Sequence, residues 1–369
     1  MMLISPFRAI DNGIFVPPFS YFFPSYGARN KSPQPYFENH ILRMIFIFIY
    51  SICRLTSIVN DFFKKAVCSI HSGMIKWEAP RKHGQKKENA MEERLNYGAL
   101  STENNNPRTA NIDKMDARQI AEVINEEDKT VAWAVEKELD SIAAAIDLLA
   151  DALRAGGRIF YCGAGTSGRL GMLDALECLP TYGLADTVIG LMAGGRRALY
   201  DATEEAEDNY DEISDMMKEH GFHAPDVCVG LSASGSAECV KGAMDYARLC
   251  GAKTVSVTCN KQNPLILRSD ISISVVVGPE VINGSTRMKA GTAQKMVLNM
   301  LSTGSMVRFG RVRGNYMAYM VPTNKKLQDR AIRIIMDKTG VSQDEAARQL
   351  RSADNVVAAA IDAIEGGCV

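Results

Sequence analysis

Residues 158–169, with the sequence RIFYCGAGTSGR, decide the fold, because an apolar run ends there in a glycine- and hydroxyl-rich turn. A helical pattern follows directly, over residues 168–178. An apolar run that passes through glycines into a helix is typical of the first strand–turn–helix unit of a parallel sheet. The segment therefore predicts an α/β fold.

The rest of the chain extends this pattern in both directions. Further strand-like runs cover residues 187–192, 226–231, 254–258 and 271–277, and helical patterns between them cover residues 198–219, 237–250 and 289–304. Continuous apolar strands separated by helices indicate a parallel sheet covered on both faces. We expect a doubly wound α/β domain over residues 91–323, preceded within it by helices at 116–129 and 130–155, and a small helical C-terminal unit at 324–369.

The first ninety residues have a different composition from the remainder. They carry a net charge of +7 against −8 for the rest, and they hold 15 of the 27 aromatic residues. The apolar run at residues 44–53 is about half the length of a bilayer span, so an interfacial or anchoring helix stays open. We expect residues 1–90 to be either a disordered extension or a translated leader, with Met91 as the start of the working protein. The near-zero total charge of −1 gives no reason to expect nucleic acid as a partner.

The turn after the first strand, residues 163–168, has the form G-x-G-x-x-G of dinucleotide-binding sites. A nicotinamide cofactor also requires an acidic residue after the second strand, and the sequence there is AGGRR. That cofactor is therefore disfavoured. Gly165, Thr166 and Ser167 instead suit a phosphate, because a helix N-terminus offers free N–H groups and hydroxyl donors; a simple helix cap is the alternative.

Two more hydroxyl-rich turns follow later strands. Ser232 and Ser234 come after the third strand, and Ser285 and Thr286 come after the fifth. Loops at the carboxyl ends of parallel strands meet at the ligand crevice of such a sheet. The sequence therefore predicts one phosphorylated ligand held by all three turns.

Metal and hydrolase chemistry are poorly supported. The nine cysteines include no C-x-x-C pair, and the body holds only His220 and His223, in a loop-like HGFH sequence. No G-x-S-x-G elbow is present. We expect no metal site, and free buried thiols in a reducing cytoplasm.

Two motifs carry a resemblance to a known family. Residues 163–183 (GAGTSGRLGMLDALECLPTYG) and 278–295 (GPEVINGSTRMKAGTAQK) closely resemble the N-acetylmuramic acid 6-phosphate etherases, which share the SIS (sugar isomerase) fold with the glucokinase regulatory protein. The resemblance covers residues 91–363. It implies cleavage of the lactyl ether of N-acetylmuramate 6-phosphate by elimination and hydration, giving N-acetylglucosamine 6-phosphate and D-lactate, in cytoplasmic cell-wall amino-sugar recycling, with no metal or redox cofactor.

Matched residue by residue, the resemblance places the family's two catalytic glutamates on Glu177 and Glu207. Glu177 lies among leucines, and an apolar setting raises a carboxyl pKa as acid catalysis requires. Glu207 lies in an acidic stretch of expected helix, where Glu204 at i, i+3 spacing stays open as a substitute.

The spacing of Ser167 and Glu177 raises a geometric problem. Ten residues of continuous helix span about 15 Å, too far for one sugar phosphate to contact both. We therefore expect either a break near Gly171 or a Glu177 that serves a neighbouring subunit. The second option agrees with the homodimer that the resemblance implies, and no membrane partner is expected.

The turn after the third strand departs from the family. Etherases commonly have Ser-Gly-Arg-Thr-Pro-Tyr there, whereas residues 234–239 are SGSAEC. The loss of Arg and the new Glu238 are expected to weaken the binding of an anion. The chain also stops about one helix pair before family members do, so the C-terminal unit is expected to be truncated. A non-catalytic sugar-phosphate sensor and another SIS-type isomerase therefore stay open as alternatives.

Overall fold

The computed structural model describes residue 98 and residues 100–367, which all lie within the structural unit Gln85–Val369. The expectations for residues 1–90 therefore lie outside the described residues.

A five-stranded parallel sheet with the order β2-β1-β3-β4-β5 forms the centre of the fold. Its strands are β1 (Ile159–Gly163), β2 (Val188–Met192), β3 (Val227–Leu231), β4 (Lys253–Thr258) and β5 (Ile271–Ser274). Every residue of β1 and β3 is buried, which explains why these strands have continuous apolar sequences rather than alternating ones. The predicted doubly wound sheet is confirmed.

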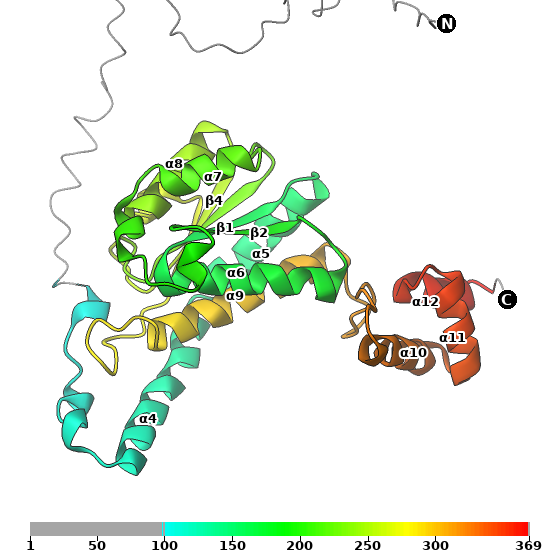
Figure 1. Cartoon of the computed structure of the whole chain (residues 1–369), viewed down its shortest axis with the longest axis horizontal. Coiled ribbons are helices and arrows are strands. Elements are labelled where there is room, and N and C mark those ends of the chain that lie inside the picture. Colours follow the sequence, from blue (N-terminus) through cyan, green and yellow to red (C-terminus); the bar gives the residue numbers. More distant parts are fainter. Residues whose placement is uncertain (1–97, 99, 368–369) are drawn as a thin grey trace, which may run out of the picture. The chain divides into compact units, whose positions relative to one another are not determined.

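Helices cover both faces of the sheet (Figure 1). On one face, α5 (Leu139–Arg154), α6 (Gly165–Tyr182) and α9 (Lys289–Arg308) share an apolar cluster with the sheet, which α4 (Ala117–Glu136) joins. On the other face, α7 (Glu212–Glu219) and α8 (Glu238–Leu249) enclose a second cluster around Phe160 and Cys162.

The order of strands fixes where a ligand can bind. The chain runs from β1 outward to β2 and then returns to β3 on the other side of β1. In open parallel sheets the crevice at such a reversal, outside the carboxyl ends of the strands, is the usual ligand site. The loops after β1 and β3 border this crevice.

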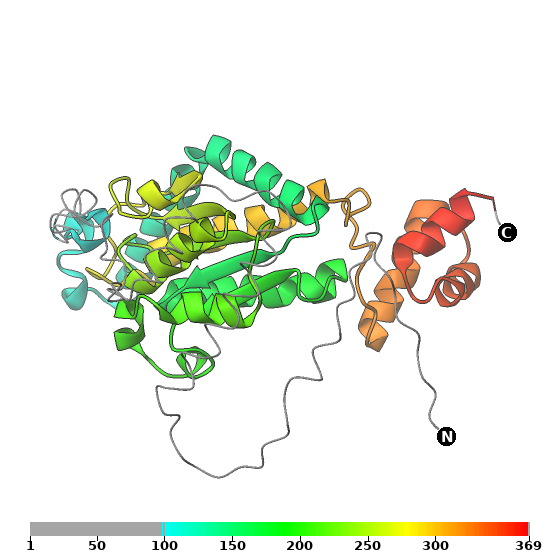
Figure 2. The ribbon, with the colours of Figure 1, turned by 90° about the horizontal axis from the view of Figure 1, so that it is seen from above.

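Three helices at the C-terminal end pack on one another around a third apolar cluster (Figure 2). They are α10 (Lys325–Thr339), α11 (Gln343–Ser352) and α12 (Val357–Glu365). Asn324 caps α10 through the Leu327 N–H, and Gly340 ends it in the left-handed conformation. Short 3-10 turns complete the fold at Ser101–Glu103, Pro107–Thr109, Ile112–Lys114, Arg197–Leu199, Glu204–Asp208 and Ile266–Arg268.

Two expectations about helices are wrong, and one of the two alternatives for Glu177 is excluded. The N-terminal helices divide at Lys137–Glu138 and not near residue 130. Residues 198–219 form two 3-10 turns and the short α7 instead of one helix. Helix α6 is continuous through Gly171 and extends past Pro180 to Tyr182, so the expected break near Gly171 does not exist.

Within the described part of the chain, no helix combines the length and the apolar character that crossing a membrane requires.

Candidate active site

The β1–α6 turn depends on two glycines that let its backbone fold tightly. A Cβ on Gly163 would lie 2.8 Å from the Gly168 nitrogen, and one on Gly168 would lie 2.8 Å from the Gly163 oxygen. Ala164 occupies the N-cap position, and no side chain caps the helix. The simple-cap interpretation is therefore wrong, and the first N–H groups of α6 keep their capacity to bind an anion.

The residues predicted to bind substrate in this turn differ in exposure. Gly165 is exposed, Thr166 is half-buried and Ser167 is buried. The Ser167 hydroxyl donates to Oε1 of Gln294 in α9, at 2.8 Å. Nε2 of Gln294 is buried and lacks a hydrogen-bond partner among the described residues. The side-chain amide of Gln294 therefore belongs to the same site as Ser167, and the sequence analysis missed it.

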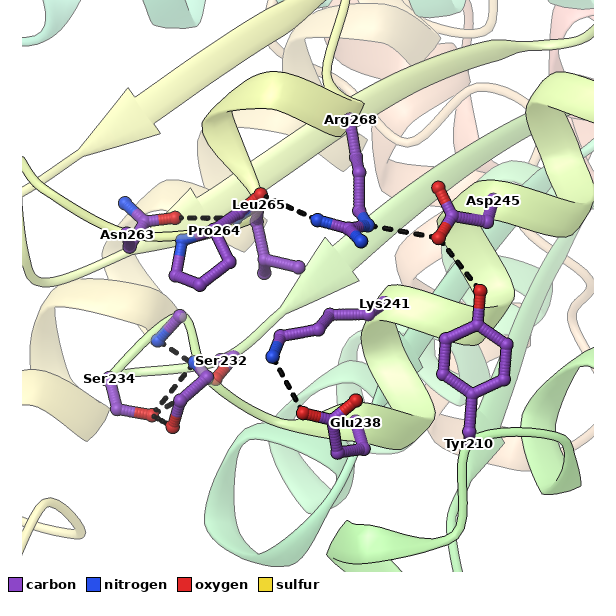
Figure 3. Close-up of polar contacts among 12 residues, drawn as sticks. Tyr210, Ser232, Ser234, Glu238, Lys241, Asp245, Asn263, Pro264, Leu265 and Arg268 are labelled. Carbon is purple, nitrogen blue, oxygen red and sulfur yellow. Dashed lines mark hydrogen bonds and ion pairs between the residues drawn. The ribbon is translucent and has the colours of Figure 1, made fainter. Parts of the chain in front are cut away.

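The turn between β3 and α8 carries a short chain of hydroxyl groups (Figure 3). Oγ of Ser232 accepts the Gly235 N–H at 3.0 Å, and Oγ of Ser234 accepts the Ser236 N–H at 3.2 Å. The Ser234 and Ser236 hydroxyls are 2.7 Å apart. These bonds preorganise the turn, and α8 also begins without a side-chain cap.

The third predicted turn reaches the first one. A Cβ on Gly291 would lie 3.4 Å from Cγ2 of Thr166 and 3.4 Å from the Thr286 oxygen. The register pairs Gly163 with Leu231, so the first and second turns also start side by side. The predicted convergence of the three turns therefore holds as geometry.

The start of α9 differs from the other two helix starts, because a carboxylate already occupies it. Glu280 is fully buried, and its two oxygens accept the N–H groups of Lys289 and Ala290 at 2.9 Å each. Burial raises the pKa of Glu280, while these two donors act in the opposite direction. An anionic ligand therefore finds open helix amides at α6 and α8 but not at these two positions of α9.

A buried ionic network fixes the same region. Nζ of Lys289 lies 2.6 Å from Oε2 of Glu127 in α4, and both side chains are nearly inaccessible. Arg108 lies 2.5 Å from the other oxygen of Glu127. The sequence analysis missed this network, although a signal existed: Glu127 lies four residues before the buried Val131, on the apolar side of its helix.

Replacing Lys289 with Met is expected to lower the free energy of unfolding by about 3–5 kcal/mol, because it leaves Glu127 buried beside a single partner. Lys253→Met is the matched control: Lys253 is an exposed lysine 2.6 Å from Asp270, worth at most about 1 kcal/mol. Urea unfolding of both variants measures the difference. Equal losses in the two variants would contradict the structural role of the network.

An N-terminal segment that the sequence analysis did not assign to the site also lies at this edge of the sheet. The Ser101 N–H and hydroxyl both donate to Oδ1 of Asn260, at 2.8 Å. Asn260 follows β4 and donates in turn to the Ala233 oxygen at 3.1 Å. A Cβ on Gly284 would lie 3.3 Å from Glu103. The sequence STE at residues 101–103 is too short to distinguish from any polar turn, so no local pattern indicates its position.

Glu177 does not meet the predicted phosphate turn within one chain. It is an exposed residue of the continuous helix α6, about 15 Å along the axis from Ser167. The leucines around it, expected to provide an apolar setting, are themselves 46–66% exposed: they are Leu173, Leu176 and Leu179. The face of α6 that carries Glu177 is therefore largely unpartnered in the single chain.

Glu207 lies in the 3-10 turn Glu204–Asp208, next to the beginning of α8. It is half-buried whereas Glu204 is exposed. Burial raises the pKa of Glu207, and the charges of Asp208 and Glu204 add to the effect. Burial likewise raises the pKa of the Cys239 thiol to about 12, with the Glu207 charge contributing. Glu207, and not the exposed Glu204, is thus the acid of this turn that is partly buried beside α8.

His220 and His223 are exposed, as expected for a surface loop. Among the described residues no cluster of three His, Cys, Asp or Glu side chains could hold a metal ion.

The fold and the turns define a SIS-domain protein. Residues 141–248 match the model of the glucokinase regulatory protein N-terminal SIS domain, and residues 207–304 match the SIS domain model. A phosphoheptose isomerase from Francisella tularensis is 16% identical with a TM-score of 0.41, over 52% of this chain and 98% of that one.

Closer relatives identify the family. The chain is 47% identical to N-acetylmuramic acid 6-phosphate etherase from Mycolicibacterium smegmatis, over 74% of this chain and 92% of the relative. It is 50% identical to the etherase of the same name from Clostridium botulinum, over 73% of this chain and 90% of the relative. The chain belongs to the N-acetylmuramic acid 6-phosphate etherase family, and is thus a carbon–oxygen lyase.

Proposed function

We propose that the protein cleaves the D-lactyl ether of N-acetylmuramate 6-phosphate to N-acetylglucosamine 6-phosphate and D-lactate, and that it acts in the cytoplasm in cell-wall amino-sugar recycling. The observation that carries this proposal is the convergence of three hydroxyl-bearing turns at the crevice of the sheet, in a chain of the etherase family that retains Glu177 and Glu207.

The phosphate group of the substrate binds at the turns. Gly165, Thr166 and Ser167 present backbone N–H and hydroxyl donors at the start of α6, and Ser232 and Ser234 do so before α8. Ser285 and Thr286 complete the site from the third turn. Helix N-termini and hydroxyl donors suit a phosphate because they offer partial positive charge and hydrogen-bond donors.

The two glutamates carry out an elimination followed by a hydration. The carboxylate of Glu207 removes the proton at C2, next to the carbonyl carbon of the open-chain sugar, and the C3–O bond breaks. Protonated Glu177 donates its proton to the departing lactate oxygen. Water then adds to the double bond, with its oxygen on C3 and a proton on C2. A raised pKa makes Glu207 a stronger base than an ordinary carboxylate.

The working form is a homodimer with a composite active site. Since α6 is continuous, Ser167 and Glu177 of one chain cannot contact the same sugar. The exposed leucines beside Glu177 provide the apolar face that a second copy would cover. Glu177 then enters the phosphate site of the partner subunit.

Mixing two inactive variants tests this arrangement. Ser167→Ala and Glu177→Gln homodimers are each expected to be inactive, and dissociation and reassociation of an equimolar mixture should restore about a quarter of the wild-type activity. This follows because half of the random dimers are mixed and one of their two sites is intact. No recovery despite verified exchange of subunits, or full activity in a strictly monomeric enzyme, would contradict the composite site.

The proposed reaction itself is tested by incubating the full chain with N-acetylmuramate 6-phosphate and assaying D-lactate. Stoichiometric release of D-lactate and N-acetylglucosamine 6-phosphate is expected. Tight binding without release would instead identify a sugar-phosphate sensor, and absence of binding would indicate another substrate; either result overturns the proposal.

A further inference from the structure

Helix α8 carries a buried lysine one turn from the serine-bearing loop. Lys241 has a side chain that is 10% exposed, and its Nζ lies 2.6 Å from Oε1 of Glu238. Glu238 is the first residue of the helix, and its side chain is 44% exposed. Glu238, the acid that departs from the family pattern, is thus paired with a lysine of the same helix. This pairing offsets the repulsion of an anion that was expected from Glu238.

The direction of the Lys241 side chain follows from its neighbours. Asp245, four residues later, already accepts the Tyr210 hydroxyl at 2.8 Å and Nε of Arg268 at 2.9 Å. Side chains on a helix also lean toward its N-terminus. Lys241 accordingly extends back along α8 to Glu238, toward the end of the helix where Ser232 and Ser234 lie (Figure 3).

The loop beside this ion pair is a rigid, neutral receptor. Its serine hydroxyls are hydrogen-bonded to one another, and a Cβ on Gly235 would come within 2.4 Å of Cβ of Asn263, which supports the turn from behind. The helix start has no side-chain cap. Ser236 occupies the position where etherases commonly have Arg, so the loop itself offers no cation.

We propose that Lys241 is the cation that binds the substrate's phosphate at this loop, exchanging its contact with Glu238 for the phosphate when the ligand enters. This inference rests on the proposed function for the identity of the sugar phosphate. Glu238 holds the lysine in place in the empty site and swings into solvent in the complex. Lys241, in the first turn of α8, thereby supplies the positive charge that etherases commonly have as Arg at position 236, and so acts as a specificity-determining residue.

Charge and burial make the exchange favourable. A lysine with a nearly inaccessible side chain needs an anionic partner at all times, because an unpaired buried charge is costly. A phosphate carries more negative charge than a carboxylate and accepts several hydrogen bonds at once. Glu238, being half-exposed, recovers its hydration when it is displaced.

Binding of three probes separates this proposal from its rivals. Isothermal titration with N-acetylglucosamine 6-phosphate, N-acetylglucosamine and D-lactate is carried out on the wild type and on Lys241→Met. We expect Lys241→Met to weaken binding of the phosphorylated sugar by about 10- to 100-fold, as for a lost hydrogen bond to a charged group. Binding of the two probes without phosphate should not change.

Three further variants keep the result interpretable. Lys253→Met, at an ion pair on the amino end of β4, should leave all three affinities unchanged. The double variant Glu238→Gln/Lys241→Met removes the whole pair, so it should fold as the wild type does and bind as Lys241→Met does. Glu238→Gln alone should bind the phosphorylated sugar at least as tightly as the wild type.

Unchanged affinity of Lys241→Met for N-acetylglucosamine 6-phosphate would overturn the proposal, and so would a loss confined to D-lactate. These outcomes are distinct from a failure of the proposed function, because they concern binding of a phosphorylated sugar and do not require release of lactate. If the Lys241→Met variant releases D-lactate at the wild-type rate with an unchanged KM, the proposed function stands and the role of Lys241 is refuted.

Discussion

Replacing Glu177 with Gln is expected to reduce kcat for D-lactate release by about 10²- to 10⁴-fold, the usual contribution of a positioned acid or base. The amide cannot donate the proton that the departing lactate oxygen needs. Because Glu177 is exposed in the single chain, the substitution should leave folding unchanged. Because its proposed contact is with the lactyl oxygen, which N-acetylglucosamine 6-phosphate lacks, the affinity for that product should also stay unchanged. Steady-state kinetics and titration measure the two effects separately.

The control for this substitution is Glu219→Gln, another exposed acid, at the end of α7. It should retain wild-type kcat and KM. A Glu177→Gln enzyme with more than a tenth of the wild-type kcat would exclude Glu177 as the acid, whatever the oligomeric state.

Replacing Glu207 with Gln is expected to have a comparable effect, whereas Glu204→Gln should retain near wild-type activity. The two residues share one 3-10 turn, but only Glu207 is half-buried against α8. The difference in activity between the two variants therefore tests whether burial, and not the local sequence, decides which glutamate acts. A larger loss in Glu204→Gln than in Glu207→Gln would reverse the assignment.

The pH profile gives an independent test of Glu207 as the base. A base must be deprotonated to act, and burial raises the pKa of Glu207. Activity should therefore fall on acidification at a pH above the range of an ordinary glutamate, and kcat/KM of the wild type should show this limb. In Glu204→Gln, which removes one neighbouring negative charge, the limb should move to lower pH. A limb that stays in place would contradict the contribution of Glu204.

The two central strands β1 and β3 could be predicted from the sequence almost to the residue because all of their residues are buried. Residues 227–231 accordingly form a continuous apolar run, and the polar Asp226 lies just outside the strand. The edge strand β5 ends at Ser274, three residues before its predicted end, and its first two residues are only partly buried.

The first two turns could be predicted for a related reason: their glycines and hydroxyls directly follow β1 and β3, so the topology brings them together. Ser285 and Thr286 are separated from β5 by a longer loop, so their position depends on how that loop folds.

The failure at residues 198–219 has a tertiary cause. The acidic pattern there suits a helix, but the Arg169 guanidinium of α6 donates hydrogen bonds to the backbone oxygens of Ala198 and Asp201, at 2.7 and 3.0 Å. Glu212 similarly accepts the Gly194 N–H at 2.9 Å. These contacts come from residues distant in sequence, so local periodicity could not show that the segment is held in short turns.

Partners inside the site were missed for the same reason. Gln294, Glu280 and Lys289 belong to a motif that was noticed, but their individual roles depend on contacts with α6, with the start of α9 and with α4. Glu238 is a different case. Its negative charge was expected to weaken anion binding, but Lys241, three residues later in the helix, forms an ion pair with it. That pairing could have been anticipated from helix spacing.

The most direct test of the account is the fate of solvent oxygen. When the wild-type chain acts on N-acetylmuramate 6-phosphate in H₂¹⁸O, the elimination and hydration predict one ¹⁸O atom on C3 of N-acetylglucosamine 6-phosphate and none in D-lactate, as read by mass spectrometry. Incorporation of ¹⁸O into lactate, which would place the cleavage on the lactyl side of the ether oxygen, or the absence of any lactate, would contradict it.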